Sequence, residues 1–145
     1  MSESAAYIDT SCLLKLLFPE PESAAVAGLI AEEAEVVVSA LARVEAEQQI
    51  VARRLGGFFN LNRQRKVQTE LRRLLELDPF VTPPSGGTLW DLALNQVAKA
   101  KVQCRTLDRL HLASMAELGI TRLITHDKRQ AAAARDLGFE VIMPE

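Results

Sequence analysis

The sequence predicts a single α/β domain in which helices flank a central, mostly parallel sheet. Its 145 residues are 48% hydrophobic and 25% charged, which suits one compact globular domain. A chain of that length buries roughly two-thirds of the surface that it exposes when unfolded. Short apolar or β-branched runs alternate with helical stretches along the whole chain, a pattern typical of a sheet wrapped by helices. No internal repeat, low-complexity tract or linker interrupts this alternation.

The chain begins with a predicted strand and two predicted helices. Residues 5–8 form an apolar run that ends in a polar turn, as a short buried strand does. Thr10 or Ser11 can then cap a leucine-rich helix, which a pair of prolines stops. Residues 23–33 are alanine-rich and follow that break, and Ser23 can cap them as a second helix.

The next segment predicts a buried strand and two long helices. Residues 36–38 are all valine, which suits a strand covered on both faces. Ser39 opens a helix that continues to about residue 55, where a glycine pair ends it. Residues 62–77 form another helix, with apolar positions on one stripe and arginines elsewhere. We expect residues 52–77 to form a helical hairpin that protrudes from the domain.

The second half of the chain predicts three more strands and three more helices. Glycines and prolines separate several of these elements, as expected of turns. In chain order they are a strand at 80–82, helices at 88–102 and 106–118, a strand at 122–125, a helix at 127–137 and a strand at 140–143.

The charge of the chain is unevenly distributed. Seventeen basic and nineteen acidic residues give a net charge of -2, which taken alone speaks against a nucleic-acid partner. Residues 1–52 carry two basic and nine acidic residues, whereas residues 53–105 carry ten basic and four acidic ones. The net charges are therefore -7 for the first segment, +6 for the second and -1 for the remaining residues. This asymmetry predicts an acidic site and a basic surface on one domain.

Composition and cysteine content point to the cytoplasm. Cys12 and Cys104 lie among apolar neighbours, as reduced packing cysteines do, although a single disulfide is the alternative. The first residues carry Glu3 and Asp9 instead of a basic stretch followed by an apolar core, so we expect no signal peptide. No uncharged apolar run approaches the roughly 20 residues that cross a bilayer. We therefore expect a cytoplasmic protein with no membrane partner.

Four carboxylates are expected at one edge of the sheet. In an open parallel sheet, ligands bind beyond the carboxyl ends of the strands. Asp9 directly follows the first predicted strand, and Asp127 follows the fourth. Glu45 lies two turns into the helix after the second strand, and Asp108 lies in the first turn of its own helix. These four side chains can converge on one point.

Such convergence needs a counter-charge. Like charges in a shared site raise one another's pKa and destabilise the fold. A divalent cation removes this penalty, and oxygen ligands of this kind suit Mg²⁺ or Mn²⁺. A carboxylate-bound metal can activate water and stabilise charge on a phosphoryl oxygen, as phosphodiester hydrolysis requires. The alternative is that these acids stabilise helix N-termini, for which Asp108 and Asp127 are well placed.

Four segments, each with one of these acids, resemble the acidic blocks of PIN-domain proteins. They are residues 7–11, 39–45, 107–114 and 123–129, and residues 133–141 are similar to the last helix and strand of the same family. More narrowly, these segments resemble VapC-type toxins of bacterial and archaeal toxin–antitoxin pairs. The resemblance covers essentially the whole chain, in order, and implies one PIN-like domain with a Rossmann-like sheet.

The resemblance implies a metal-dependent endoribonuclease that is the toxin of a type II toxin–antitoxin pair. Asp9, Asp108 and Asp127 match the family's acidic residues and would hold Mg²⁺ or Mn²⁺. Glu45 would complete the shell directly or through water, so these four are the expected catalytic residues. An activated water would attack a phosphodiester of RNA in line, leaving a 5′-phosphate and a 3′-hydroxyl. The expected partners are the RNA substrate, a cognate antitoxin and a second copy of the chain.

Small hydroxyl residues and a histidine accompany the acids. Thr10, Ser11 and Thr125 match residues at the same places in the family, where they can orient carboxylates or waters. His111 follows Asp108 by three residues and so lies near the same helix face. For His111 we favour a partly buried packing role over catalysis.

A basic run occupies the middle of the chain. Phosphate contacts supply sequence-independent affinity, so these residues can bind an RNA backbone; a solvated helical face is the alternative. For Phe58 and Phe59, which lie within the run, we favour packing against protein over stacking on bases. The candidate RNA-binding residues are Arg53, Arg54, Arg63, Arg65 and Lys66, continued by Arg72 and Arg73.

Two other functions fit the same chain. A catalytically silent PIN-fold module would keep the fold and regulate through a partner protein or DNA. Negligible Mn²⁺ binding and no RNA cleavage, together with tight partner binding, would favour it. A phosphotransfer or phosphatase domain would need a second acid beside Asp9, and the following Thr10 and Ser11 do not supply one.

Overall fold

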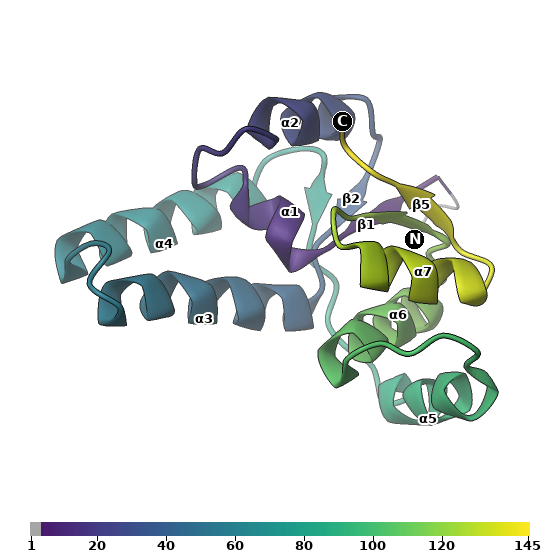
Figure 1. The fold of residues 1–145 in the computed structure, drawn as a ribbon. Helices are drawn as coiled ribbons and strands as arrows, with labels where there is room; N and C mark the ends of the chain where they lie inside the picture. The colour runs from purple at the N-terminus through teal and green to yellow at the C-terminus, as the bar shows by residue number, and fades with distance from the viewer. Residues whose placement is uncertain (1–3) are drawn as a thin grey trace.

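Five short strands form one sheet in which every neighbouring pair runs parallel. The computed structural model describes residues 4–145. Glu3, one basis for expecting no signal peptide, lies outside the described residues. The order in the sheet is β3-β2-β1-β4-β5 (Figure 1). The mostly parallel sheet expected from the sequence is therefore entirely parallel over the described residues. The strands are β1 Ala6–Ile8, β2 Val36–Val37, β3 Phe80–Val81, β4 Arg122–Ile124 and β5 Glu140–Ile142.

Helices cover both faces of this sheet, so the domain has three layers (Figure 1). Within residues 4–145, no helix is both long and apolar enough to span a membrane. The helices are α1 Thr10–Leu14, α2 Ser23–Ala31, α3 Ala40–Leu55, α4 Leu61–Leu75, α5 Leu89–Lys99, α6 Thr106–Leu118 and α7 Lys128–Asp136. The predicted helix at 88–102 thus ends earlier, at Lys99.

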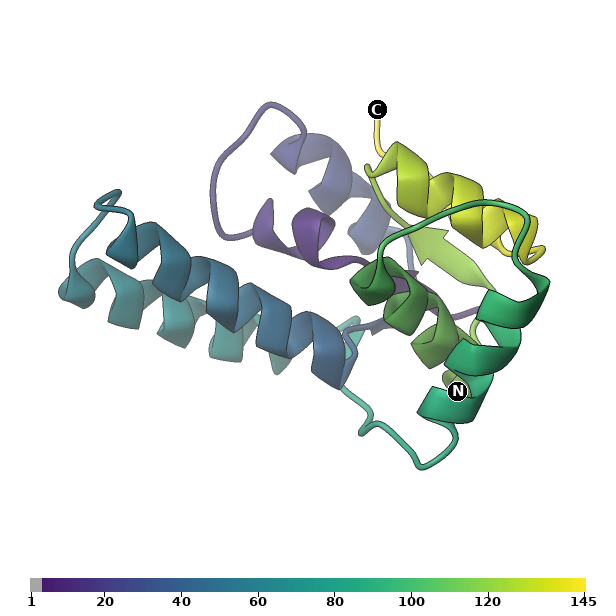
Figure 2. The same cartoon turned by 60° about the horizontal axis from the view of Figure 1, so that its bottom comes forward.

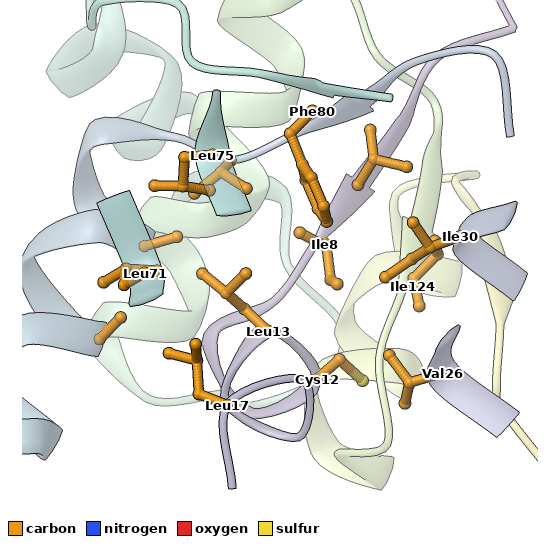
Figure 3. Packing of buried hydrophobic residues seen from close by; sticks show 14 of the residues in the cluster. Ile8, Cys12, Leu13, Leu17, Val26, Ile30, Leu71, Leu75, Phe80 and Ile124 are labelled. Atoms are coloured by element: carbon orange, nitrogen blue, oxygen red, sulfur yellow. The ribbon is translucent and has the colours of Figure 1, made fainter. Parts of the chain in front are cut away.

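Alternate residues of the strands build a separate core on each face. Ile8 and Ile124 pack with apolar residues of α1, α2, α3 and α4 on one face (Figure 3). Tyr7 and Leu123 point to the opposite face, because successive side chains of a strand alternate, and pack there with α6 and α7. Helix α5 packs on the outside of α6. Tyr7 therefore faces the helix that carries Asp108 and His111.

Two helix starts differ from the sequence prediction. The N-cap of α1 is Asp9, not Thr10 or Ser11, because the Asp9 carboxylate accepts the backbone N–H of Cys12. The N-cap of α2 is Glu22, and Ser23 is the first helical residue. The Asp9 cap ties the end of β1 directly to α1, which fixes this acid at the carboxyl edge of the sheet.

The predicted protrusion is present but longer than expected. Helices α3 and α4 run side by side and extend away from the sheet (Figures 1 and 2). Ile50, Val67 and Leu71 are fully buried along the hairpin, which explains why the two helices stay together. The hairpin begins at Ala40, the start of α3, rather than near residue 52.

Both cysteines are free thiols, as packing cysteines are.

Candidate active site

All four predicted acids line one pocket of about 540 Å³. Asp9 and Asp127 reach it as the N-caps of α1 and α7, and Glu45 and Asp108 reach it from α3 and α6. Arg105 lines the same pocket. The acids do not meet at one point, as the sequence suggested they could. Among residues 4–145, no group of three or more His, Cys, Asp or Glu side chains is close enough to hold a metal ion. The acids instead have separate hydrogen-bond and ion-pair partners.

Asp9 is buried and accepts hydrogen bonds from three donors. Its side chain is only 4% exposed. Oδ1 accepts the backbone N–H of Cys12 at 2.8 Å and the Ser11 hydroxyl at 3.0 Å. Oδ2 accepts the hydroxyl of Thr125, which comes from the end of β4. Two of the three predicted hydroxyl residues therefore orient this carboxylate.

Thr125 also contacts Asp127 and Gln130. Its Oγ1 accepts the backbone N–H of Asp127 at 3.0 Å and lies 3.3 Å from Gln130 Oε1. Because the single hydroxyl proton goes to Asp9, the Gln130 oxygen cannot accept it as well. A half-turn of the Gln130 amide lets Nε2, which is buried and without a partner, donate to Thr125 instead. Gln130, which the sequence reading did not single out, thus supports Asp9 indirectly.

Arg105 bridges the other two aspartates. Its Nε lies 3.3 Å from Asp108 Oδ2, and its Nη2 lies 3.1 Å from Asp127 Oδ2. The hydrogen bond to Asp108 is the largest cause of the raised pKa of Arg105, followed by the charges of both acids. Asp127 is also the N-cap of α7, through Oδ1. The only sequence signal for this bridge is the i,i+3 spacing of Arg105 and Asp108.

Glu45 receives its hydrogen bonds on one oxygen. Oε1 accepts the hydroxyl of Thr10 at 2.8 Å and contacts Nε2 of His111. Partial burial raises the pKa of Glu45, but the His111 contact and the Thr10 hydrogen bond outweigh it, so the net pKa is lowered. Glu45 is therefore held as a carboxylate at the pocket wall.

His111 is buried in the expected place but makes more than packing contacts. Its Nδ1 is hydrogen-bonded to the hydroxyl of Tyr7, which in turn lies 2.6 Å from Oγ of Ser39. Burial is the main cause of the raised pKa of Tyr7, so this phenol keeps its proton. Tyr7 and Ser39 are linked to the site although the sequence shows them only as a core residue and a helix cap.

The chemistry of this pocket suits a hard divalent cation. Its candidate ligands are carboxylate oxygens, with hydroxyls behind them, and this donor set is typical of Mg²⁺ and Mn²⁺. The Arg105 guanidinium between Asp108 and Asp127 shows that positive charge is already favoured at this place. The kinds of donor present therefore fit the predicted metal, although among residues 4–145 no three of them lie close enough together to bind it as they stand.

The basic residues of the hairpin fall into two groups. Arg63, Arg65 and Lys66 are exposed on α4. Arg53 and Arg54 are half-buried and held by the protein itself: Arg53 lies 3.8 Å above the Phe18 ring, and Arg54 donates to Gln64. The first group is therefore available to a partner, whereas the second fixes the hairpin to α1 and to itself.

The two phenylalanines at the hairpin turn also separate. Phe59 stacks on Phe18 with 6.2 Å between ring centroids, as the packing prediction expects. Phe58 is 81% exposed, so it does not pack within the chain, and its contact with another protein stays a prediction. The positive φ of the preceding Gly57 belongs to the tight turn that points Phe58 outward.

The fold and the site together define a class of protein: an α/β domain with an acidic pocket at the carboxyl edge of an all-parallel, five-stranded sheet. Residues 6–136 match the family model described as PIN domain. Ribonuclease VapC46 of Mycobacterium tuberculosis is 34% identical over 148 aligned residues, which cover 97% of this chain and 98% of that protein. The chain therefore belongs to the VapC family of PIN-domain proteins.

Solved structures agree with this fold. The M. tuberculosis toxin VapC20, described as cleaving the sarcin–ricin loop, has a TM-score of 0.71 at 16% identity and covers 96% of this chain and 99% of its own. VapBC2 of Rickettsia felis, bound to a DNA fragment from its promoter, has a TM-score of 0.73 at 10% identity. That match covers 97% of this chain and 99% of the other. At such identities the likeness concerns the fold alone.

Proposed function

We propose that this chain is a metal-dependent endoribonuclease and acts as the toxin of a toxin–antitoxin pair. The observation that carries the proposal is the single pocket shared by Asp9, Glu45, Asp108 and Asp127 at the carboxyl edge of the sheet. Family membership supports it, because the relative VapC46 is named a ribonuclease.

Three aspartates would hold the cation. Asp9, Asp108 and Asp127 would bind Mg²⁺ or Mn²⁺, and Glu45 would complete the shell directly or through water. When bound, such a cation supplies Lewis-acid chemistry that favours attack of water on a phosphodiester at neutral pH. Ser11 and Thr125 keep Asp9 in one orientation, and Thr10 does the same for Glu45.

The exposed cations of the hairpin would hold the RNA. Arg63, Arg65 and Lys66 line a shallow surface hollow on α4 and are exposed to contact phosphates, although Arg63 lies 4.0 Å from the Glu70 carboxylate. Arg53 and Arg54 would act mainly by keeping the hairpin in place. We propose a structured RNA as the substrate, because unpaired loops present splayed bases for recognition.

The proposed protein partners are an antitoxin and a second copy of the chain. The similar structure from R. felis is a VapBC2 assembly. On this chain, Trp90, Leu94 and Val97 of α5 are 64%, 68% and 60% exposed and recur at helical spacing. An apolar stripe of this kind supports a homodimer contact along α5.

The proposal is tested with Asp108→Asn, expressed in a bacterium that lacks the antitoxin. We expect the parent chain to arrest growth and the variant not to, because the variant loses a metal ligand. Asp136→Asn, at the end of α7 and outside the pocket, is the matched control and should arrest growth like the parent.

The purified chain supplies the second half of the test. Cleavage of RNA should require Mg²⁺ or Mn²⁺ and stop when EDTA is in excess. Arrest by Asp108→Asn at parental strength, or cleavage that survives EDTA, would overturn the proposal. A parent chain that cuts no RNA but holds a partner tightly would instead indicate the silent regulatory module.

A further inference from the structure

A continuous chain of hydrogen bonds runs from the helix cap of α3 to the acidic pocket. It joins Ser39 Oγ, the Tyr7 hydroxyl, both ring nitrogens of His111 and Oε1 of Glu45. Ser39, Tyr7 and His111 are each at most 3% exposed, whereas Glu45 reaches the pocket. The Tyr7 and His111 rings also meet edge to face at 5.6 Å between centroids.

The protons of this chain can be assigned one by one. A Glu45 carboxylate can only accept, so His111 Nε2 carries a proton. When the ring carries only this one proton, Nδ1 is an acceptor and the Tyr7 hydroxyl donates to it. The Tyr7 oxygen can accept the hydroxyl proton of Ser39, whose own oxygen accepts the N–H of Ala42 at 3.1 Å. Each of these protons then has an acceptor within the chain.

The other neutral tautomer does not fit. A proton on His111 Nδ1 would leave Nε2 with a lone pair facing the Glu45 carboxylate. It would also turn the Tyr7 proton toward Ser39 or the buried Ser114 hydroxyl and away from His111. Because these groups are buried, an unmatched contact is unfavourable. The Glu45 carboxylate and the Tyr7 hydroxyl therefore together favour the tautomer with the proton on Nε2.

The chain has a direct consequence for Glu45. Both of its hydrogen bonds, from Thr10 and His111, end on Oε1. Over residues 4–145, no other protein group is hydrogen-bonded to Oε2. One oxygen is thus anchored and the other remains available to the pocket.

We propose that His111 is a positioning residue for Glu45, and that Tyr7, anchored by Ser39, fixes the tautomer in which His111 does so. The effect on catalysis rests on the proposed function, but the tautomer and the metal affinity can be measured without it. A packing role alone would require only the bulk of the imidazole ring.

The tautomer is read first, by nitrogen-15 NMR of histidine in the metal-free chain. We expect the His111 signals to place the proton on Nε2. Tyr7→Phe, which removes only the hydroxyl, should shift these signals toward a mixture of tautomers. A proton on Nδ1 in the parent, or no response to Tyr7→Phe, would overturn the proposal.

Two substitutions of His111 then separate positioning from packing. His111→Gln keeps a donor near the place of Nε2, whereas His111→Asn is too short to reach Glu45. We expect Mn²⁺ affinity, measured by calorimetry, to fall about tenfold in His111→Asn and clearly less in His111→Gln. Equal losses in both variants would contradict the proposal.

A double-mutant cycle closes the test. In a Glu45→Gln background, His111→Asn should cost no further Mn²⁺ affinity, because its target carboxylate is gone. Additive losses would mean a general structural role and would overturn the proposal. Met115→Leu, a volume-conserving change on the next turn of α6, is the control for packing, and thermal unfolding verifies that every variant folds. A parent chain with the expected tautomer and coupling but no RNA cleavage would refute only the proposed function.

Discussion

Asp9 has two tasks, and two substitutions separate them. It caps α1 through Oδ1, and it is one of the four acids of the pocket. Asp9→Asn keeps an oxygen for the cap but removes the charge, whereas Asp9→Ala removes both. We therefore expect both variants to lose RNA cleavage, and only the alanine variant to lose much stability.

The magnitudes follow from the contacts of Asp9. In Asp9→Ala, the lost cap costs about 1 kcal/mol. The buried Thr125 hydroxyl loses its acceptor as well, which costs about 1–3 kcal/mol. The free energy of unfolding should fall by about 2–4 kcal/mol in total. In Asp9→Asn, the new amide can donate to Thr125, whose proton can go to the Gln130 amide oxygen once that amide makes the reverse half-turn. Removing one like charge offsets the weaker hydrogen bonds, so the loss should stay near or below about 1 kcal/mol.

Thermal unfolding in metal-free buffer, followed by circular dichroism, measures this difference. For a chain of this size, 1 kcal/mol corresponds to about 4 °C in Tm. Asp9→Ala should melt about 8–16 °C below the parent, and Asp9→Asn within about 4 °C of it. An equal drop in both variants would refute the assignment of the cap. An Asp9→Asn variant that still cleaves RNA would refute the catalytic role.

Three further predictions concern charge. Arg105→Ala should bind Mn²⁺ several-fold more tightly in calorimetry, because the guanidinium competes with the cation for Asp108 and Asp127. The same variant should raise the KM for RNA. Weaker Mn²⁺ binding would show that Arg105 does not compete with the cation. Arg65→Glu should weaken RNA binding and reduce the slope of log Kd against log salt concentration by about one, as expected when one phosphate contact is lost. Arg135→Glu, on the exposed side of α7, is its control, and an equal effect in both would place the RNA elsewhere. The Gly86 N–H, at 2.6 Å, is the main cause of the lowered pKa of Glu117. A carboxyl group whose pKa is lower in the folded chain than in the unfolded chain stabilises the fold at pH values above its unfolded pKa. This stabilisation is lost as the pH falls through the folded pKa. Glu117→Gln should therefore lower the urea midpoint at about pH 7, and the gap to the parent should close by about pH 3; a constant gap would contradict this reasoning.

Local patterns predict most of the fold. The apolar and β-branched runs correspond to β1 to β5, because a strand buried on both faces needs such residues at consecutive positions. Asp9 and Asp127 could be placed at one sheet edge for the same reason: each follows a strand, and all strands are parallel. Glu45 and Asp108 followed from their helices, and the pocket indeed contains them.

The partners of these acids could not be predicted, because they depend on tertiary register. Tyr7 is 104 residues from His111, and only its place on the α6 side of β1 brings its hydroxyl to that ring. The same holds for Arg53, whose contact with Phe18 requires the hairpin to pack beside α1. A charge run shows which residues are basic, but burial decides which of them remain available to a partner.

The separate partners explain how four like charges share one pocket in a metal-free fold. Asp9 is balanced by N–H and hydroxyl donors, Glu45 by Thr10 and His111, and the remaining pair by Arg105. The donors to Asp9 and Glu45 end on oxygens in fixed orientations and can stay when a cation binds. Arg105 differs, because it is exposed and lies between two of the expected ligands. Metal binding would therefore exchange one cation for another at Asp108 and Asp127, and it would release Arg105 toward the phosphate of an RNA. The net charge of -2 counts all four acids as free, and without them the sum is +2, which is the sign that an RNA substrate requires.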